Sequence, residues 1–328
     1  MKRDIAILFS SAGRRVELIR CFRRAAEELG VTCRMVATDM EPGWSPACQT
    51  ADVCFAVPRC TDAAFMPTIK ALCQREHVRM IVPTIDTELA VFAEHAADCA
   101  KQGLRVVVPS AAFVAMSRDK METARLLETC GVAAPQTWLA DVPASLPPAA
   151  YPLIAKPRQG SASIGVHGLA NDRERRRFVA KLSAQDAGNY VLQTLCRGRE
   201  LTVHAFYRAG RLICAAPHHR KLVRAGEVCF AETVACPLAQ SAAAALARPF
   251  TGLSGVICFQ GFEDGEVFLV TEINARFGGG YPLADAAGGR FARWLIQETL
   301  GLAPEGAPEY QIGLRMLRYD AAVFVPTC

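Results

Sequence analysis

The chain has 328 residues, of which 51% are hydrophobic and 21% are charged, and its formal net charge is +5. This length and composition can support a large buried core and two or three domains, which excludes an intrinsically disordered protein. The basic residues are mostly scattered, which argues against a nucleic-acid-binding protein. The 14 cysteines lie in apolar stretches without a CxxC pair or a metal-ligand spacing, as is typical of reduced core cysteines.

The N-terminal residues do not form a secretory signal peptide, since Asp4 and Gly13 interrupt the only early apolar run. No apolar run along the sequence reaches the length of a transmembrane helix. We therefore expect a soluble, cytoplasmic protein with neither a membrane nor a nucleic acid as its partner.

The first third of the chain alternates apolar runs with amphipathic helical patterns. Strands are predicted over residues 5–9, 33–39, 80–83 and 105–108, and helices over 16–29, 65–76 and 89–102. This alternation predicts a parallel, doubly wound sheet, which binds ligands at the carboxyl ends of its strands. Residues Ser10–Arg14, Asp39 and Asp86–Glu88 should therefore surround one crevice.

The turn after the first strand does not have the sequence of a dinucleotide site. It reads Ser-Ser-Ala-Gly-Arg-Arg over residues 10–15, instead of Gly-x-Gly-x-x-Gly. The glycines that let a pyrophosphate approach the backbone are missing, so a nicotinamide-dependent dehydrogenase is not favoured.

The rest of the chain has the pattern of an α+β protein with antiparallel strands. Helices are predicted over 118–130 and 240–251, and strands over 153–157, 190–195, 201–207, 212–216, 256–262 and 267–273. Residues 143–152 are rich in Pro and Ala and predict a loop. Glu263-Asp264-Gly265-Glu266 predicts a hairpin turn between the last two strands.

A lysine at the end of a strand precedes a flexible Gly/Ser loop. Lys156-Pro157 is followed by Arg-Gln-Gly-Ser-Ala-Ser-Ile-Gly over residues 158–165. Lysine supplies a compact positive charge, and glycine backbone and serine hydroxyl groups suit phosphate oxygens. An ordinary surface loop is the alternative, because the P-loop order of glycines before lysine is absent. A second segment, Gln193 to Glu200, could offer backbone groups to a nucleobase and a carboxylate to a ribose, although a plain strand–loop–strand explains it equally well.

The most informative cluster lies on the predicted hairpin. Glu272 and Asn274 are two residues apart and share one strand face, while Gln260 can face them from the neighbouring strand. One carboxylate and two amide oxygens suit Mg²⁺. Arg276 is placed on the same face, where charge develops during phosphoryl transfer. Exposed polar strand residues are the alternative, but they do not explain why an apolar strand ends in such a dense polar run.

The order of these motifs resembles that of ATP-grasp enzymes. The stretches SSAGRR, PTIDTEL, SRDK, QGFEDGEVFLVTEINARFGGGYPLADAAG and LRYD are similar to single-module relatives of the large subunit of carbamoyl-phosphate synthase. The resemblance covers essentially the whole chain. It implies a pre-ATP-grasp Rossmann-like domain over residues 1–115, a central ATP-grasp lobe with a mobile Gly/Ser loop over 116–195, and a C-terminal lobe with the metal site over 196–328.

The resemblance also implies roles for individual residues. The phosphates of ATP would contact Lys120 and Lys156, under a loop that contains Gly160, Ser161 and Ser163. The hinge at Gln193 and Leu195 would hold adenine, and Glu200 the ribose. Magnesium, or manganese in its place, would bind Gln260, Glu272 and Asn274. Arg276, with Lys156, would be catalytic.

The reaction implied is ligation of a carboxylate to an amine through an acyl phosphate, with release of ADP and phosphate. An ATP-grasp kinase and a non-catalytic ATP-binding module are the alternatives. The substrates are expected to be an amino acid or similar small carboxylate and an amine, and many relatives are homodimers. Candidate substrate-binding residues, each with ordinary structural pairing as an alternative, are Arg14, Asp86, Glu88, Arg220, Arg224 and Arg318.

The chain departs from the family pattern at two positions. His204 stands where relatives often carry an acid, and no role is predicted for it. Ala275 replaces a common proline, which should change strand geometry more than chemistry. Neither change removes a predicted ligand, so an active enzyme is expected.

Overall fold

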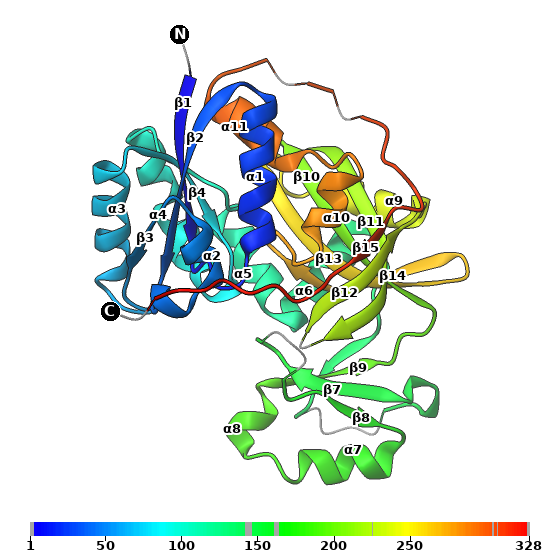
Figure 1. Cartoon of the computed structure of the whole chain (residues 1–328). Helices are drawn as coiled ribbons and strands as arrows, with labels where there is room; N and C mark the ends of the chain where they lie inside the picture. Colours follow the sequence, from blue (N-terminus) through cyan, green and yellow to red (C-terminus); the bar gives the residue numbers. More distant parts are fainter. Residues whose placement is uncertain are drawn as a thin grey trace.

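A parallel five-stranded sheet, ordered β3-β2-β1-β4-β5, forms the first domain in the computed structural model (Figure 1). Its strands are β1 (Arg3–Ser10), β2 (Val31–Asp39), β3 (Val53–Ala56), β4 (Val78–Pro83) and β5 (Arg105–Val106). The connecting helices are α1 (Val16–Glu28), α2 (Pro46–Thr50), α3 (Phe65–Arg75) and α4 (Leu89–Lys101), with short 3-10 turns η1 (Pro42–Trp44) and η2 (Asp86–Glu88). The predicted doubly wound sheet is confirmed.

The structure describes residues 3–141, 146–160, 164–224, 226–303, 305–306 and 308–326. Within these residues, every helix is too short or too polar to pass through a lipid bilayer.

A small antiparallel sheet, ordered β6-β9-β7-β8, forms the central lobe. Its strands are β6 (Thr137–Leu139), β7 (Leu153–Pro157), β8 (His167–Leu169) and β9 (Tyr190–Thr194). The helices of this part are α5 (Ala111–Arg118), α6 (Lys120–Cys130), α7 (Asp172–Val179) and α8 (Ala184–Ala187), with a 3-10 turn η3 (Pro148–Ala150). The predicted helix over 118–130 begins later because the Asp119 side chain caps α6 by accepting the backbone N–H groups of Met121 and Glu122.

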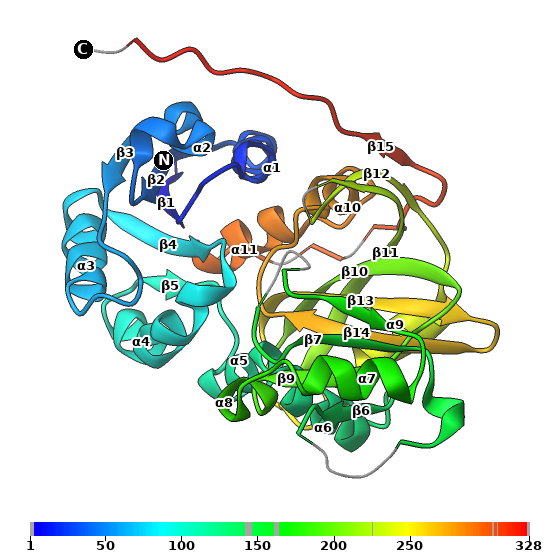
Figure 2. The ribbon, with the colours of Figure 1, turned by 90° about the horizontal axis from the view of Figure 1, so that it is seen from below.

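A six-stranded antiparallel sheet, ordered β14-β13-β10-β11-β12-β15, forms the C-terminal lobe (Figure 2). Its strands are β10 (Arg199–Arg208), β11 (Arg211–Arg224), β12 (Glu227–Thr233), β13 (Gly255–Asp264), β14 (Val267–Asn274) and β15 (Arg315–Leu317). The accompanying helices are α9 (Pro237–Leu246), α10 (Tyr281–Ala286) and α11 (Phe291–Thr299). The sequence did not predict β12 or β15, and β11 runs to Arg224 instead of ending at Ala216, because its second half is polar and lacks an apolar alternation.

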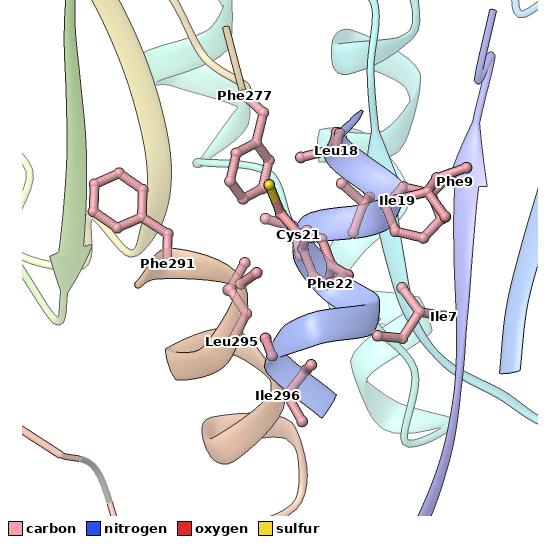
Figure 3. Packing of buried hydrophobic residues seen from close by; sticks show 14 of the residues in the cluster. Ile7, Phe9, Leu18, Ile19, Cys21, Phe22, Phe277, Phe291, Leu295 and Ile296 are labelled. Atoms are coloured by element: carbon pink, nitrogen blue, oxygen red, sulfur yellow. The ribbon is translucent and has the colours of Figure 1, made fainter. Parts of the chain in front are cut away.

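The first domain and the C-terminal lobe share a hydrophobic core between α1 and α11 (Figure 3). Phe22 of α1 packs edge-on against Phe9 of β1 at 5.2 Å between ring centroids and against Phe277 at 5.7 Å. All three rings are almost completely buried. Because Phe277 directly follows Arg276, this packing fixes the end of the polar segment after β14 against the first domain.

Candidate active site

The hairpin of β13 and β14 brings the predicted metal ligands together. Gln260 pairs directly with Glu272 in the strand register, and Cys258 pairs with Asn274. The Asn274 Nδ2 group donates a hydrogen bond to Glu272 Oε1 at 2.9 Å, so both side chains lie on the same strand face. The predicted juxtaposition of Gln260, Glu272 and Asn274 is therefore confirmed, while their role as metal ligands stays a prediction.

Arg276 connects this hairpin to the first domain. Its Nη2 group donates to Asp86 Oδ2 at 2.7 Å and to Asn274 Oδ1 at 3.3 Å, and its Nη1 group donates to the carbonyl of Phe277 at 2.9 Å. Only 12% of the Arg276 side chain is exposed. Asp86 belongs to η2, which follows β4 in the first domain. A predicted substrate residue of the first domain, Asp86, therefore contacts the predicted catalytic residue of the C-terminal lobe, Arg276.

Two lysines from the central lobe face Glu272. Burial lowers the pKa of Lys156, at the end of β7, to about 8, and the nearby Glu272 carboxylate partly opposes this shift. Burial also lowers the pKa of Lys120, at the start of α6, again opposed by Glu272. Lys120 Nζ donates to the carbonyl of Gly160 at 3.3 Å. Two desolvated cations beside one carboxylate favour binding of an anionic ligand.

Two small cavities both have Glu272 and Asn274 in their linings. The first, about 70 Å³, is also lined by Asp86, Lys120 and Gly160. The second, about 120 Å³, is called the inner pocket here. It is lined by Arg15, Thr202, Arg220, Gly226, Glu227, Val228, Cys258, Gln260, Glu272, Asn274, Arg276 and Gly278–Gly280. The predicted serines Ser161 and Ser163 lie outside the described residues.

The predicted adenine hinge needs one correction. Gln193 is buried and donates through Nε2 to Thr137 Oγ1 at 2.9 Å. The backbone N–H of Leu195 donates to the carbonyl of Pro152 at 2.9 Å, so in this conformation it is not free to meet a nucleobase edge. The Leu195 side chain, 40% exposed, remains available for apolar contact. The predicted ribose ligand Glu200 forms an ion pair with Arg220 at 3.4 Å.

Cys196 is a hinge residue that the sequence did not single out. Burial raises the pKa of its thiol to about 11, and the Lys156 ammonium group opposes that shift. The residue therefore lies close to Lys156, at the junction of β9 and β10. Nothing distinguishes it in the sequence except its position directly after Leu195.

Glu88 is part of the framework of the site and not a substrate ligand. It is fully buried, and its carboxylate accepts hydrogen bonds from Ser10 Oγ at 2.6 Å and Ser11 Oγ at 2.7 Å. It also accepts the backbone N–H groups of Thr84 and Ile85 at 2.7 and 3.2 Å. These contacts tie the carboxyl ends of β1 and β4 together and leave the side chain no access to a substrate, which corrects its predicted role.

Three of the other candidate substrate residues border a larger cavity, called the outer pocket here, while Arg220 lines the inner pocket and Asp86 the cavity beside Lys120. Arg14, Arg224 and Arg318 line the outer pocket, and Arg15 and Glu227 line both it and the inner pocket. Glu227 forms ion pairs with Arg15 at 3.3 Å and Arg318 at 2.8 Å. Neither of these two shared residues was predicted from the sequence as part of the site. The Arg14-Arg15 doublet gave a signal for Arg15, but Glu227 had none because β12 was not predicted.

A row of three glycines separates the inner pocket from two buried histidines. His204 and His218 are fully buried and stack at 5.3 Å between ring centroids. A Cβ atom on Gly278 would lie 2.7 Å from His204 Cε1, and one on Gly280 would lie 2.6 Å from His218 Nε2. Burial lowers the pKa of both rings, to about 3 for His218, so they are neutral near pH 7. The structure thus places His204 behind the pocket.

Elsewhere in the described part of the chain, His, Cys, Asp and Glu side chains form no group of three or more that could hold a metal ion. The hairpin cluster does not conflict with this finding, since two of its three members are amides. One carboxylate with amide oxygens suits a hard cation that retains waters and shares phosphate ligands.

Comparison with known families identifies two parts of the chain. Residues 7–107 match the family model described as the PylC-like N-terminal domain. Residues 187–322 match the model described as ATP-grasp in the biosynthetic pathway with Ter operon. A comparison with curated proteins gave no significant match.

Many solved structures have the same fold. The biotin carboxylase domain of Hydrogenobacter thermophilus 2-oxoglutarate carboxylase, a dimer in complex with MgADP, ADP and bicarbonate, is 16% identical, with a TM-score of 0.70 over 94% of this chain and 73% of that chain. An L-amino acid ligase from Bacillus licheniformis is 20% identical, with a TM-score of 0.66 over 93% and 76%. N5-carboxyaminoimidazole ribonucleotide synthetase from Thermus thermophilus is 18% identical, with a TM-score of 0.66 over 92% and 79%.

Proposed function

We propose that this chain, an ATP-grasp protein with a PylC-like N-terminal domain, is an ATP- and magnesium-dependent ligase that joins a carboxylate to an amine. The observation that carries the proposal is the convergence of Lys120, Lys156 and Arg276 on the pair Glu272 and Asn274. Three cations beside a hard oxygen cluster suit the binding and transfer of a phosphoryl group.

In this proposal the nucleotide binds between the central lobe, residues 116–195, and the C-terminal lobe, residues 196–328. Lys120 and Lys156 would hold its phosphates, and Lys120 lies at the backbone of Gly160. The ribose would displace or share the ion pair of Glu200 with Arg220. Adenine would lie at the hinge, beside Gln193 and the side chain of Leu195.

Gln260, Glu272 and Asn274 fit magnesium by chemistry and position, because they offer oxygen ligands on facing strands beside the lysines. Manganese accepts similar ligands. When bound, the metal would neutralise charge on the phosphates during transfer.

The reaction proposed for the inner pocket has two steps. A carboxylate oxygen of the substrate attacks the terminal phosphorus of ATP, ADP leaves and an acyl phosphate forms, with Arg276 near enough to stabilise the negative charge. An amine then attacks the acyl carbon, and the phosphate leaves as an amide bond forms.

Two similar structures support small-molecule substrates. One is an amino-acid ligase and one is a ribonucleotide synthetase, as their names state. A homodimer is included in the proposal because another similar structure is described as a dimer.

The test measures ADP and phosphate release by the purified protein with Mg-ATP and amino acids, supplied singly and in pairs. We expect ADP release that depends on a pair, together with an amide product identified by its mass. Glu272→Gln should lower turnover at least about 10²-fold, since it removes the one carboxylate of the cluster. Glu266→Gln, in the exposed hairpin turn, is the matched control.

A stable phosphorylated product would show a kinase instead. Equal Mg-ATP affinity in Glu272→Gln and Glu266→Gln, without turnover in the unsubstituted protein, would contradict the proposed metal site and ligase activity together.

A further inference from the structure

The outer pocket is larger than the inner pocket and opens beside it. Its volume is about 290 Å³, against about 120 Å³ for the inner pocket. Arg15, Glu227, Gly278 and Gly279 line both, so the two pockets share one boundary. A small reacting group fits the inner pocket, and the outer pocket has room for the rest of a substrate.

The first domain and the C-terminal tail build the outer pocket jointly. Val16 and Leu18 of α1 lie on one side, and Tyr319–Val323 lie on another. The tail leaves β15 and runs back past the first domain, as both ribbon views show (Figures 1 and 2). Apolar surface from these segments could contact a carbon skeleton, which leaves recognition to the charged side chains.

Positive charge exceeds negative charge in the outer pocket. Five arginines line it, but only three carboxylates. Arg20 is paired with Glu17 at 2.6 Å, and Arg224 is paired with Asp320, so those two carboxylates are already neutralised. The third, Glu227, is shared by Arg15 and Arg318. Among the residues that the structure describes, Arg14 has no ion-pair partner within 4.0 Å.

The excess charge is concentrated at the boundary between the pockets. Arg15 lies there with only 18% of its side chain exposed. Burial lowers its pKa, Arg276 and Arg318 lower it further, and Glu227 and Asp86 oppose them. Arginine nevertheless stays charged near pH 7, so three arginines, Arg15, Arg276 and Arg318, lie near one another with two carboxylates, Glu227 and Asp86. An anion bound at this boundary would relieve that imbalance.

The boundary itself holds two charged side chains close to a glycine backbone. The residues common to both pockets are Arg15 and Glu227, which contribute side chains, and Gly278 and Gly279, which contribute only backbone. A Cβ atom on Gly279 would lie 2.5 Å from Glu227 Oε2 and 3.1 Å from Arg15 Nη1, so any larger residue would crowd this place. Glycine at this position therefore lets the side chains of Arg15 and Glu227 lie directly against the backbone at the boundary.

We propose that the substrate activated by this enzyme carries a second anionic group, a carboxylate or a phosphate, and that Arg14, Arg15 and Arg318 bind this group in the outer pocket while the reacting carboxylate lies in the inner pocket. The inference rests on the proposed ligase function for the reacting end. Recognition of the second group depends only on the arginines, because guanidinium groups bind carboxylate and phosphate oxygens in the same paired geometry.

The test compares dianions with matched monoanions by titration calorimetry in the presence of Mg²⁺ and a non-hydrolysable ATP analogue. Glutarate is paired with pentanoate, and phosphoglycolate with glycolate. We expect at least one dianion to bind about tenfold or more tightly than its partner, since it gains a charge-assisted contact. Tighter binding of glutarate than of pentanoate would indicate a second carboxylate, and tighter binding of phosphoglycolate than of glycolate would indicate a phosphate.

Arg14→Gln tests the pocket without breaking an ion pair, and Arg59→Gln, another exposed arginine of the first domain, is the matched control. Arg14→Gln should weaken dianion binding about tenfold and leave monoanion binding unchanged, while Arg59→Gln changes neither. Equal binding of dianions and monoanions, no dianion binding, or identical results for the two variants would each overturn the proposal.

Parallel ADP assays with added amines separate this inference from the proposed function. Dianion binding that is sensitive to Arg14→Gln, without ADP release, would support the outer pocket and count against the ligase. ADP release with monocarboxylates as efficient as with dianions would support the ligase and overturn the requirement for a second anionic group.

Discussion

Arg276 and Asp86 are 190 residues apart in the sequence, yet the Nη2 group of Arg276 donates to Asp86 Oδ2 at 2.7 Å. Their contact joins the segment that follows β14 to the turn after β4. The side chains are 12% and 25% exposed, so the pair is largely shielded from water. It therefore both positions the proposed catalytic arginine and connects the first domain to the C-terminal lobe.

Asp86→Asn is expected to weaken this connection and lower kcat, because Arg276 loses its charged partner and is oriented less firmly. A double-mutant cycle of Asp86→Asn with Arg276→Gln, followed by urea unfolding, should give a coupling of about 1.5–3 kcal/mol. Asp98→Asn removes an exposed pair with Lys70 and should leave the unfolding free energy unchanged. A coupling near zero would show that the contact has no energetic role.

Lys156 should make Mg-ATP binding depend on pH. Its pKa in the free protein is about 8, because burial disfavours the charged form. Raising the pH above 8 removes the ammonium charge, so the affinity for Mg-ATP should fall by up to about tenfold per pH unit. Calorimetric titrations from pH 7 to pH 9.5 measure this change. Lys156→Arg stays charged and should flatten the profile; an equally steep profile in that variant would assign the effect to another group.

Glu88→Ala should destabilise the first domain. The substitution leaves the hydroxyl groups of Ser10 and Ser11 and two backbone N–H groups without their buried acceptor. We expect a loss of about 3 kcal/mol or more in the free energy of unfolding, measured by urea denaturation. Glu94→Ala, on the exposed side of α4, should change it by less than about 0.5 kcal/mol. Similar losses in both variants would contradict the assigned framework role.

Gly278→Ala should reduce both stability and activity. Its new methyl group would lie 2.5 Å from Cys258 Sγ and 2.7 Å from His204 Cε1, and both of these side chains are buried. Overpacking of this kind costs about 1–3 kcal/mol, and relief of the clash would distort the inner pocket. Gly252→Ala meets no atom within 4 Å and provides the control for thermal unfolding and ADP release. Unchanged turnover in Gly278→Ala would contradict the expected distortion of the inner pocket by the new methyl group.

The local pattern of the sequence was sufficient for the first sheet and for the β13–β14 hairpin. The alternation of apolar strands such as Ile5–Phe9 with amphipathic helices indicated a parallel sheet. Likewise, the two-residue spacing of Glu272 and Asn274, with a hairpin turn before them, placed them on one face opposite Gln260. These features depend on residues that are close in the sequence.

By itself, then, the sequence determined the class of fold and the cluster around Glu272, because strand alternation and turn chemistry are local properties. Only the tertiary structure decided which candidates reach that cluster. Glu88 is a buried structural residue, and the backbone N–H group of Leu195 donates to the carbonyl of Pro152. Glu227 belongs to β12, a strand that was not predicted, and forms ion pairs with Arg15 and Arg318. The physical reason is that burial and ion pairing between distant segments depend on how the domains pack, which no local period in the sequence encodes.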